Sequence, residues 1–136
     1  MTSTQVKQNQ SFQYSDRIVR RAEIALFCSP FKLNLFAAMR NQSVPIPAIA
    51  SQIGLQKNYI KKLIPENKAE GELVWLINVG LLRREVDGQG LTDSFRLTPL
   101  GRQIVAKWEN KTDSFPTPKL LERIINALNR WFGRSL

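Results

Sequence analysis

The apolar residues of this chain recur mostly at helical spacing, and the short stretch 94–98 alternates polar and apolar residues as a strand does. The first apolar stripe follows Asp16, a fair helix-capping residue, and predicts a helix that ends near Cys28. Its apolar positions are Ile18, Val19, Ala22, Ala25 and Leu26. Residues 1–15 carry few large apolar side chains, so we expect them to form a disordered arm.

Three Ser/Thr-Pro pairs predict further helix starts, because serine and threonine cap helices and proline is tolerated in a first turn. The pairs are Ser29-Pro30, Thr98-Pro99 and Thr117-Pro118. They predict helices over residues 31–39, 99–110 and 118–132, each with an apolar stripe.

Glycine and proline divide the stretch that follows residues 31–39. A short helix is predicted over 48–53, and we expect Gly54 to stop it in the left-handed conformation. Another helix is predicted over 56–64, where Pro65 terminates or kinks it.

The following apolar run, 72–79, is predicted to be helical and to be closed by Gly80. A β-hairpin is expected next. Its strands are 81–86 and 94–98, and the glycine-containing segment 87–90 forms the turn.

The composition excludes several classes of protein. The chain has 136 residues, enough for one domain with a real core, but no histidine and one cysteine, Cys28. Histidine-dependent triads, imidazole metal sites, internal disulfides and multi-thiolate clusters are therefore excluded. We expect no metal, no cofactor and no enzymatic activity. With no apolar run near the ~20 residues of a membrane span and no signal peptide, we expect a cytoplasmic protein.

The charge is unusual in sign. The 20 lysine and arginine residues outnumber the 11 aspartate and glutamate residues, for a formal net charge of +9. Such an excess indicates an acidic partner, which could be nucleic acid, an anionic membrane or an acidic protein, although it can also serve solubility alone.

The order of predicted elements is that of a winged helix-turn-helix domain. Residues 73–84, an apolar segment ending in Gly-Leu-Leu-Arg-Arg, and 95–101, Phe-Arg-Leu-Thr-Pro-Leu-Gly, resemble bacterial regulators of the MarR and PadR type. They also resemble the winged-helix dimerisation domain of small-molecule methyltransferases. In addition, residues 46–55 resemble the segment of these proteins that runs from the second helix to the following turn.

The resemblance implies a mainly α (α+β) fold, a winged helix-turn-helix with a two-stranded wing and extra N- and C-terminal helices. The winged-helix domain would span 16–110, a linker 111–117, and a C-terminal amphipathic helix 118–136. The chain departs from the family pattern between Gly54 and Gly80, which is too long for one recognition helix and contains Pro65. Either the recognition helix is split or a loop is inserted.

We place the recognition helix at 56–64, because its polar face has no acidic residue and suits phosphate contact. The expected DNA-binding residues on it are Gln56, Lys57, Asn58, Lys61 and Lys62. The wing would add Arg83, Arg84, Gln89 and Arg96. The segment after Pro65 is a poorer DNA face, since Glu66, Glu70 and Glu72 offset Lys68.

A full apolar stripe runs along the C-terminal helix and needs a surface to cover it. It consists of Leu120, Leu121, Ile124, Ile125, Leu128, Trp131 and Phe132. A homodimer interface is our first interpretation, since such regulators commonly dimerise through terminal helices. The chain's own core and a membrane surface are the alternatives.

Two functions follow. The first is a dimeric transcriptional regulator that binds double-stranded DNA. The second is a winged-helix module that binds an acidic protein without specific DNA recognition, favoured by the lack of arginine, the commonest base reader, at 56–64. Whether an effector ligand exists is not decided by the sequence.

Overall fold

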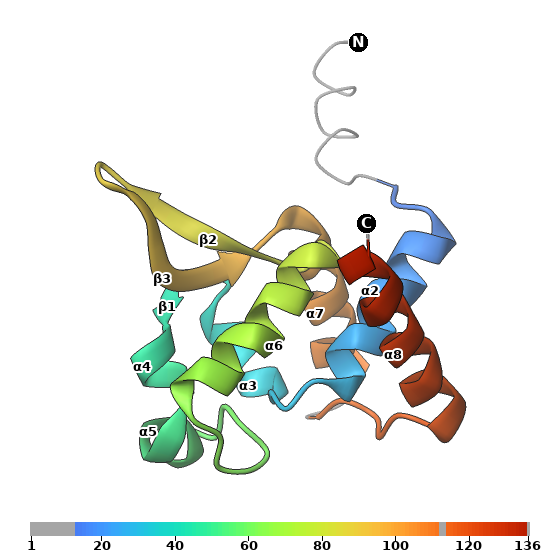
Figure 1. The fold of residues 1–136 in the computed structure, drawn as a ribbon, viewed down its shortest axis with the longest axis horizontal. Helices are drawn as coiled ribbons and strands as arrows, with labels where there is room; N and C mark the ends of the chain where they lie inside the picture. Colours follow the sequence, from blue (N-terminus) through green and yellow to red (C-terminus); the bar gives the residue numbers. More distant parts are fainter. Residues whose placement is uncertain (1–12, 112–113, 136) are drawn as a thin grey trace, which may run out of the picture.

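The computed structural model describes residues 13–111 and 114–135 (Figure 1). The predicted class, helical with a small sheet, is confirmed over these residues. The helices are α2 (Asp16–Cys28), α3 (Leu33–Ala38), α4 (Ile46–Ile49), α5 (Ser51–Gln56), α6 (Glu66–Asn78), α7 (Pro99–Lys111) and α8 (Leu120–Ser135). The strands are β1 (Val44–Pro45), β2 (Leu82–Asp87) and β3 (Gly90–Leu97).

The sheet is antiparallel, with strand order β1-β3-β2. The predicted hairpin is confirmed as β2 and β3, whose far end projects from the helices (Figure 1). The third strand, β1, was not predicted. It pairs Val44 with Phe95 at the inner end of the hairpin and so joins the sheet to the helical body.

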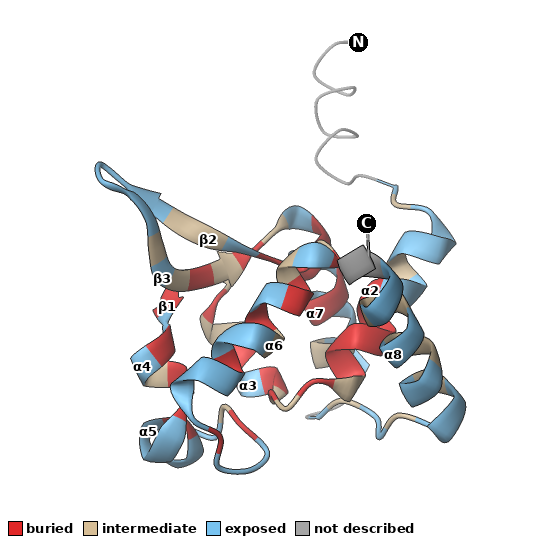
Figure 2. Ribbon diagram, in the orientation of Figure 1, coloured by how far each residue is buried: buried red, intermediate tan, exposed pale blue. Residues whose placement is uncertain are grey.

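One hydrophobic core takes side chains from α2, α3, α4, α6, α7 and the inner parts of the three strands, and among the described residues it takes none from α5 or α8 (Figure 2). Its largest fully buried side chains include Phe31, Phe36 and Phe95. Over residues 13–111 and 114–135, no helix combines the length and the apolar character that a membrane crossing requires.

One of the three predicted Ser/Thr-Pro helix starts is confirmed. Thr98 caps α7 at Pro99, where its Oγ1 accepts a hydrogen bond from the Gly101 amide at 3.0 Å. The other two are wrong by two residues, since α3 begins at Leu33 and α8 at Leu120. Ser29 instead closes α2, because its hydroxyl donates to the carbonyl of Leu26 at 2.7 Å.

The predicted role of Gly54 is wrong. It lies inside α5 and is buried, and a Cβ there would stand 1.8 Å from the carbonyl oxygen of Ile49. Glycine is therefore needed for the close approach of α4 and α5. The residues near this point that adopt the left-handed conformation are Ser51, with φ of 60°, and Asn58, with φ of 63°.

The helix predicted over 56–64 is also wrong. The chain leaves α5 after Gln56 and runs as a loop to Pro65. The reason is backbone pairing with residues 30–32. The Lys32 amide donates to the Tyr59 carbonyl, and the Lys61 amide donates to the Pro30 carbonyl, both at 2.8 Å. These bonds fix residues 59–61 in an extended conformation that a helix could not provide.

The next helix is longer than the predicted apolar run. α6 begins at Glu66, directly after Pro65, and includes the acidic stretch 66–71, for which no helix was predicted. Its predicted end is confirmed, because Gly80 follows with φ of +90°.

Replacement of Gly54 with alanine tests the close approach of α4 and α5. We expect Gly54→Ala to lower the free energy of unfolding by about 3 kcal/mol, the upper end of the usual overpacking cost, because the new methyl group overlaps a backbone oxygen. Gly71→Ala is the matched control, since Gly71 lies in α6 with nothing within 4 Å of its Cβ position. It should raise stability by about 0.5–1 kcal/mol. Equal urea midpoints for the two variants would contradict this packing.

Candidate nucleic-acid interface

The connection between α5 and α6, residues 57–65, carries the predicted DNA-binding lysines. Lys57, Lys61 and Lys62 are exposed there, although on a loop and not on a helix. Asn58 is exposed too, and its Oδ1 accepts a hydrogen bond from Lys32 Nζ at 2.6 Å. Sequence reasoning missed Lys32, because only the backbone pairing of 30–32 with 59–61 brings it to this surface.

Lys61 is held more firmly than its neighbours. Its ammonium donates to the carbonyl of Phe27 at 3.2 Å. Burial lowers the pKa of Lys61, and the positive charges of Arg123 and Lys32 lower it further, while the Cys28 thiol acts in the opposite direction. Several cations therefore lie close together at this point of the surface.

The start of α6 continues this surface. Asn67 and Lys68 are exposed in its first turn, next to Glu66. Farther along the helix, the carboxylates are neutralised by other elements. Glu70 forms an ion pair with Arg84 at 3.2 Å, and Glu72 forms one with Arg130 at 3.1 Å. The exposed lysines near α6 therefore lie at its N-terminal end, on the preceding loop and in the first turn.

The predicted wing residues divide into two kinds. Arg84 and Arg96 are half-buried, and Arg96 pairs with Glu85 at 3.0 Å. The Arg84 guanidinium, already paired with Glu70, also lies 4.8 Å from the ring centre of Phe95. Arg83 and Gln89 are exposed, so these two of the four predicted residues face solvent directly.

The C-terminal helix α8 docks on α2 and α6 through its polar side. Asn126 Oδ1 accepts a hydrogen bond from the Trp75 indole at 3.0 Å. Glu122 pairs with Arg20 of α2 at 2.7 Å, and Arg130 pairs with Glu72. Burial raises the pKa of the Cys28 thiol, and the nearby Glu122 carboxylate raises it further.

The predicted apolar stripe of α8 consequently faces outward. Ile125 is half-buried, and the other six residues are exposed. Their exposed fractions are Leu120 74%, Leu121 66%, Ile124 48%, Leu128 50%, Trp131 68% and Phe132 60%. Among the described residues, the chain's own core therefore does not cover this stripe.

The comparisons with known proteins identify a family for this chain. A family model described as Npun_F0494-like matches residues 12–130, and the chain belongs to that family. Neither the curated proteins nor the solved structures include a significant match. The geometry of the loop, the β2–β3 hairpin and α8 is therefore what bears on function.

Proposed function

We propose that this chain is a winged-helix protein that binds double-stranded DNA through residues 57–62 and the first turn of α6. The element order supports the winged-helix assignment. Helix α3, strand β1, the α4–α5 pair, helix α6 and the β2–β3 hairpin follow one another as in that domain, with one antiparallel sheet. By this order, α6 takes the place of the recognition helix, and β2–β3 that of the wing.

The observation that carries the proposal is the position of the exposed lysines. In helix-turn-helix domains, the N-terminal residues of the recognition helix approach the base edges. Lys57, Lys62 and Lys68 lie on the loop that enters α6 and on its first turn. Their ammonium groups suit phosphate contact, and Asn67 in the same turn suits an adenine edge.

Phosphate contacts would dominate the affinity. α6 carries no arginine, and Glu66 in its first turn would repel a phosphate. Arg83 and Gln89 are the exposed wing residues that would flank the duplex. This arrangement favours strongly salt-dependent binding with modest sequence discrimination.

A second function is favoured by a separate observation. Arg84 and Arg96 of the wing are already paired with carboxylates, and the exposed face of α6 contains acidic residues. Both features suit a module whose lysine surface binds an acidic protein and does not enter a DNA groove. The DNA-binding experiment must distinguish this acidic-protein function from DNA binding.

We also propose that two copies of the chain associate through α8. α8 has 16 residues, docks by its polar side and exposes six large apolar side chains. Such an exposed apolar stripe is typical of a surface that binds a partner. A second α8 offers the same apolar stripe, so a two-fold contact is self-complementary. An anionic membrane is the alternative occupant, because Lys119 and Arg123 lie beside the stripe.

The DNA proposal is tested with Lys57→Glu combined with Lys62→Glu. Fluorescence anisotropy with a labelled random duplex should show wild-type binding that weakens steeply with salt. The double variant should bind roughly tenfold more weakly or worse, with a log–log salt slope reduced by about 1.8, which is two phosphate contacts.

The matched control is Arg17→Glu combined with Arg102→Glu, which changes the net charge equally at exposed sites on α2 and α7. It should keep most of the affinity. If the two double variants bind DNA equally, the loop is not the site. If wild type binds no duplex at low salt but binds poly-glutamate, the acidic-protein alternative replaces the proposal.

The dimer is tested by sedimentation. We expect wild type at twice its 15.6 kDa mass, and Leu128→Ser combined with Trp131→Ser as a monomer with an unchanged far-UV spectrum. Val86→Ser with Leu91→Ser removes two exposed apolar side chains from the hairpin instead and should stay dimeric. If wild type is monomeric and pellets with anionic vesicles, the stripe binds a membrane surface and not a second copy of the chain.

A further inference from the structure

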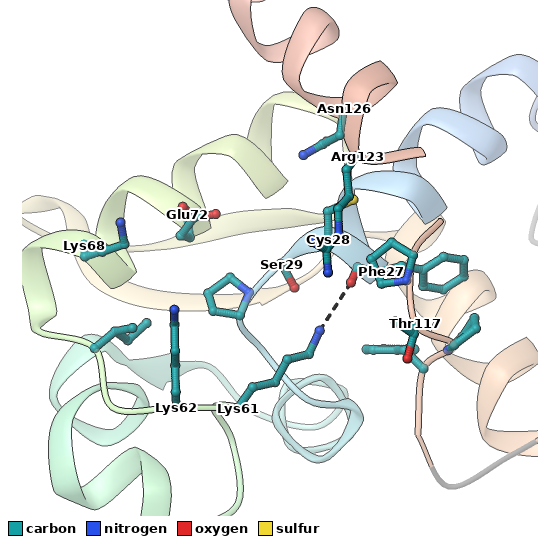
Figure 3. A pocket seen from close by; sticks show the side chains of 15 residues that line it. Phe27, Cys28, Ser29, Lys61, Lys62, Lys68, Glu72, Thr117, Arg123 and Asn126 are labelled. Atoms are coloured by element: carbon teal, nitrogen blue, oxygen red, sulfur yellow. Dashed lines mark hydrogen bonds between the residues drawn. The ribbon is translucent and has the colours of Figure 1, made fainter. Parts of the chain in front are cut away.

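A cavity of about 680 Å³ opens where four segments meet: the end of α2, the loop before α6, the outer side of α6 and the start of α8 (Figure 3). Residues 115–118, which precede α8, form part of its wall. Its volume falls within the roughly 300–1,000 Å³ of typical small-molecule sites.

The cavity is strongly basic. Among the described residues that line it, four are cationic, namely Lys61, Lys62, Lys68 and Arg123. One is acidic, and this residue, Glu72, is already paired with Arg130. Lys61 and Arg123 enter the space from opposite sides in Figure 3. Four positive charges around a partly enclosed volume repel one another and attract an anion.

The remaining wall is largely apolar. Phe27, Ile64 and Phe115 line it, together with three prolines. Asn126 also reaches the cavity, and its side chain bridges to the Trp75 indole. An inorganic ion would leave the apolar surface uncovered, whereas an organic anion could use both parts of the wall.

We propose that this cavity binds a small organic anion, with its charged head between Lys61 and Arg123 and its apolar body against Phe115 and Ile64. A carboxylate or a phosphate monoester would satisfy the head position equally well. The proposal does not rest on DNA binding, since Lys61 and Arg123 face the cavity. Lys62 and Lys68, however, belong both to this wall and to the proposed DNA surface, so a bound anion would reduce their attraction for DNA.

The probe for this site is 8-anilinonaphthalene-1-sulfonate, an aromatic anion that fluoresces when shielded from water. Titration of the full chain should give one saturable transition. Lys61→Gln combined with Arg123→Gln should raise the dissociation constant at least tenfold. Arg102→Gln combined with Lys111→Gln, which removes the same charge on α7, should change it less than twofold. The uncharged analogue N-phenyl-1-naphthylamine should bind wild type much more weakly.

Two further measurements locate the bound probe on the protein. The double variant Leu128→Ser, Trp131→Ser should still show the saturable transition. If this variant loses the transition, the probe binds the exposed stripe of α8 and not the cavity. Phenyl phosphate should displace the probe from wild type, and benzyl alcohol should not. If the Lys61 variant unfolds early in a thermal melt, Arg123→Gln alone should still weaken binding at least threefold. Equal affinity of the cavity variants and the charge-matched control would overturn the proposal.

Discussion

The backbone pairing between residues 30–32 and 59–61 is the constraint on which the rest of the surface depends. Its two 2.8 Å hydrogen bonds, with a third from the Ser51 amide to the Ile64 carbonyl at 2.9 Å, hold the loop before α6 in place. They bury Ile60 and Ile64 in the core. The intervening lysines, Lys61 and Lys62, stay at the surface, because burial of a charged ammonium group away from water costs free energy. The basic surface and the basic cavity both result from this one arrangement.

The docking of α8 follows a similar logic. The half of the helix that meets the body supplies Asn126, Glu122 and Arg130, which pair with Trp75, Arg20 and Glu72 of α6 and α2. Trp75 is buried and Glu72 is partly buried, so these two polar groups need partners. Satisfying them turns the apolar stripe toward solvent. The same docking closes one side of the cavity and sets Arg123 opposite Lys61. A single helix thus links the proposed subunit contact to the proposed anion site.

Local chemistry made part of the fold predictable. Thr98 before Pro99, Gly80 after α6 and the glycine turn of the hairpin act within a few residues, so the sequence alone locates them. The loop at 57–65 was mispredicted because its lysine spacing fits a helix, while the bonds that oppose a helix come from a segment almost 30 residues earlier. Lys32 and Arg123 were not predicted for the same reason, since only tertiary packing brings them to this surface. Lys68 was predicted to be offset by the neighbouring glutamates, two of which pair with arginines of other elements. Gly54 shows that a glycine can serve close packing where its position suggests a helix stop.

The central claim is that the loop before α6 and the first turn of α6 meet DNA. Amide chemical-shift mapping during titration with a short duplex tests it most directly, because it needs no substitution. The account predicts shifts concentrated at 57–62 and 66–68, with smaller ones at the hairpin turn 88–90. Shifts confined to α7 or to the outer face of α8, or none at low salt, would contradict it.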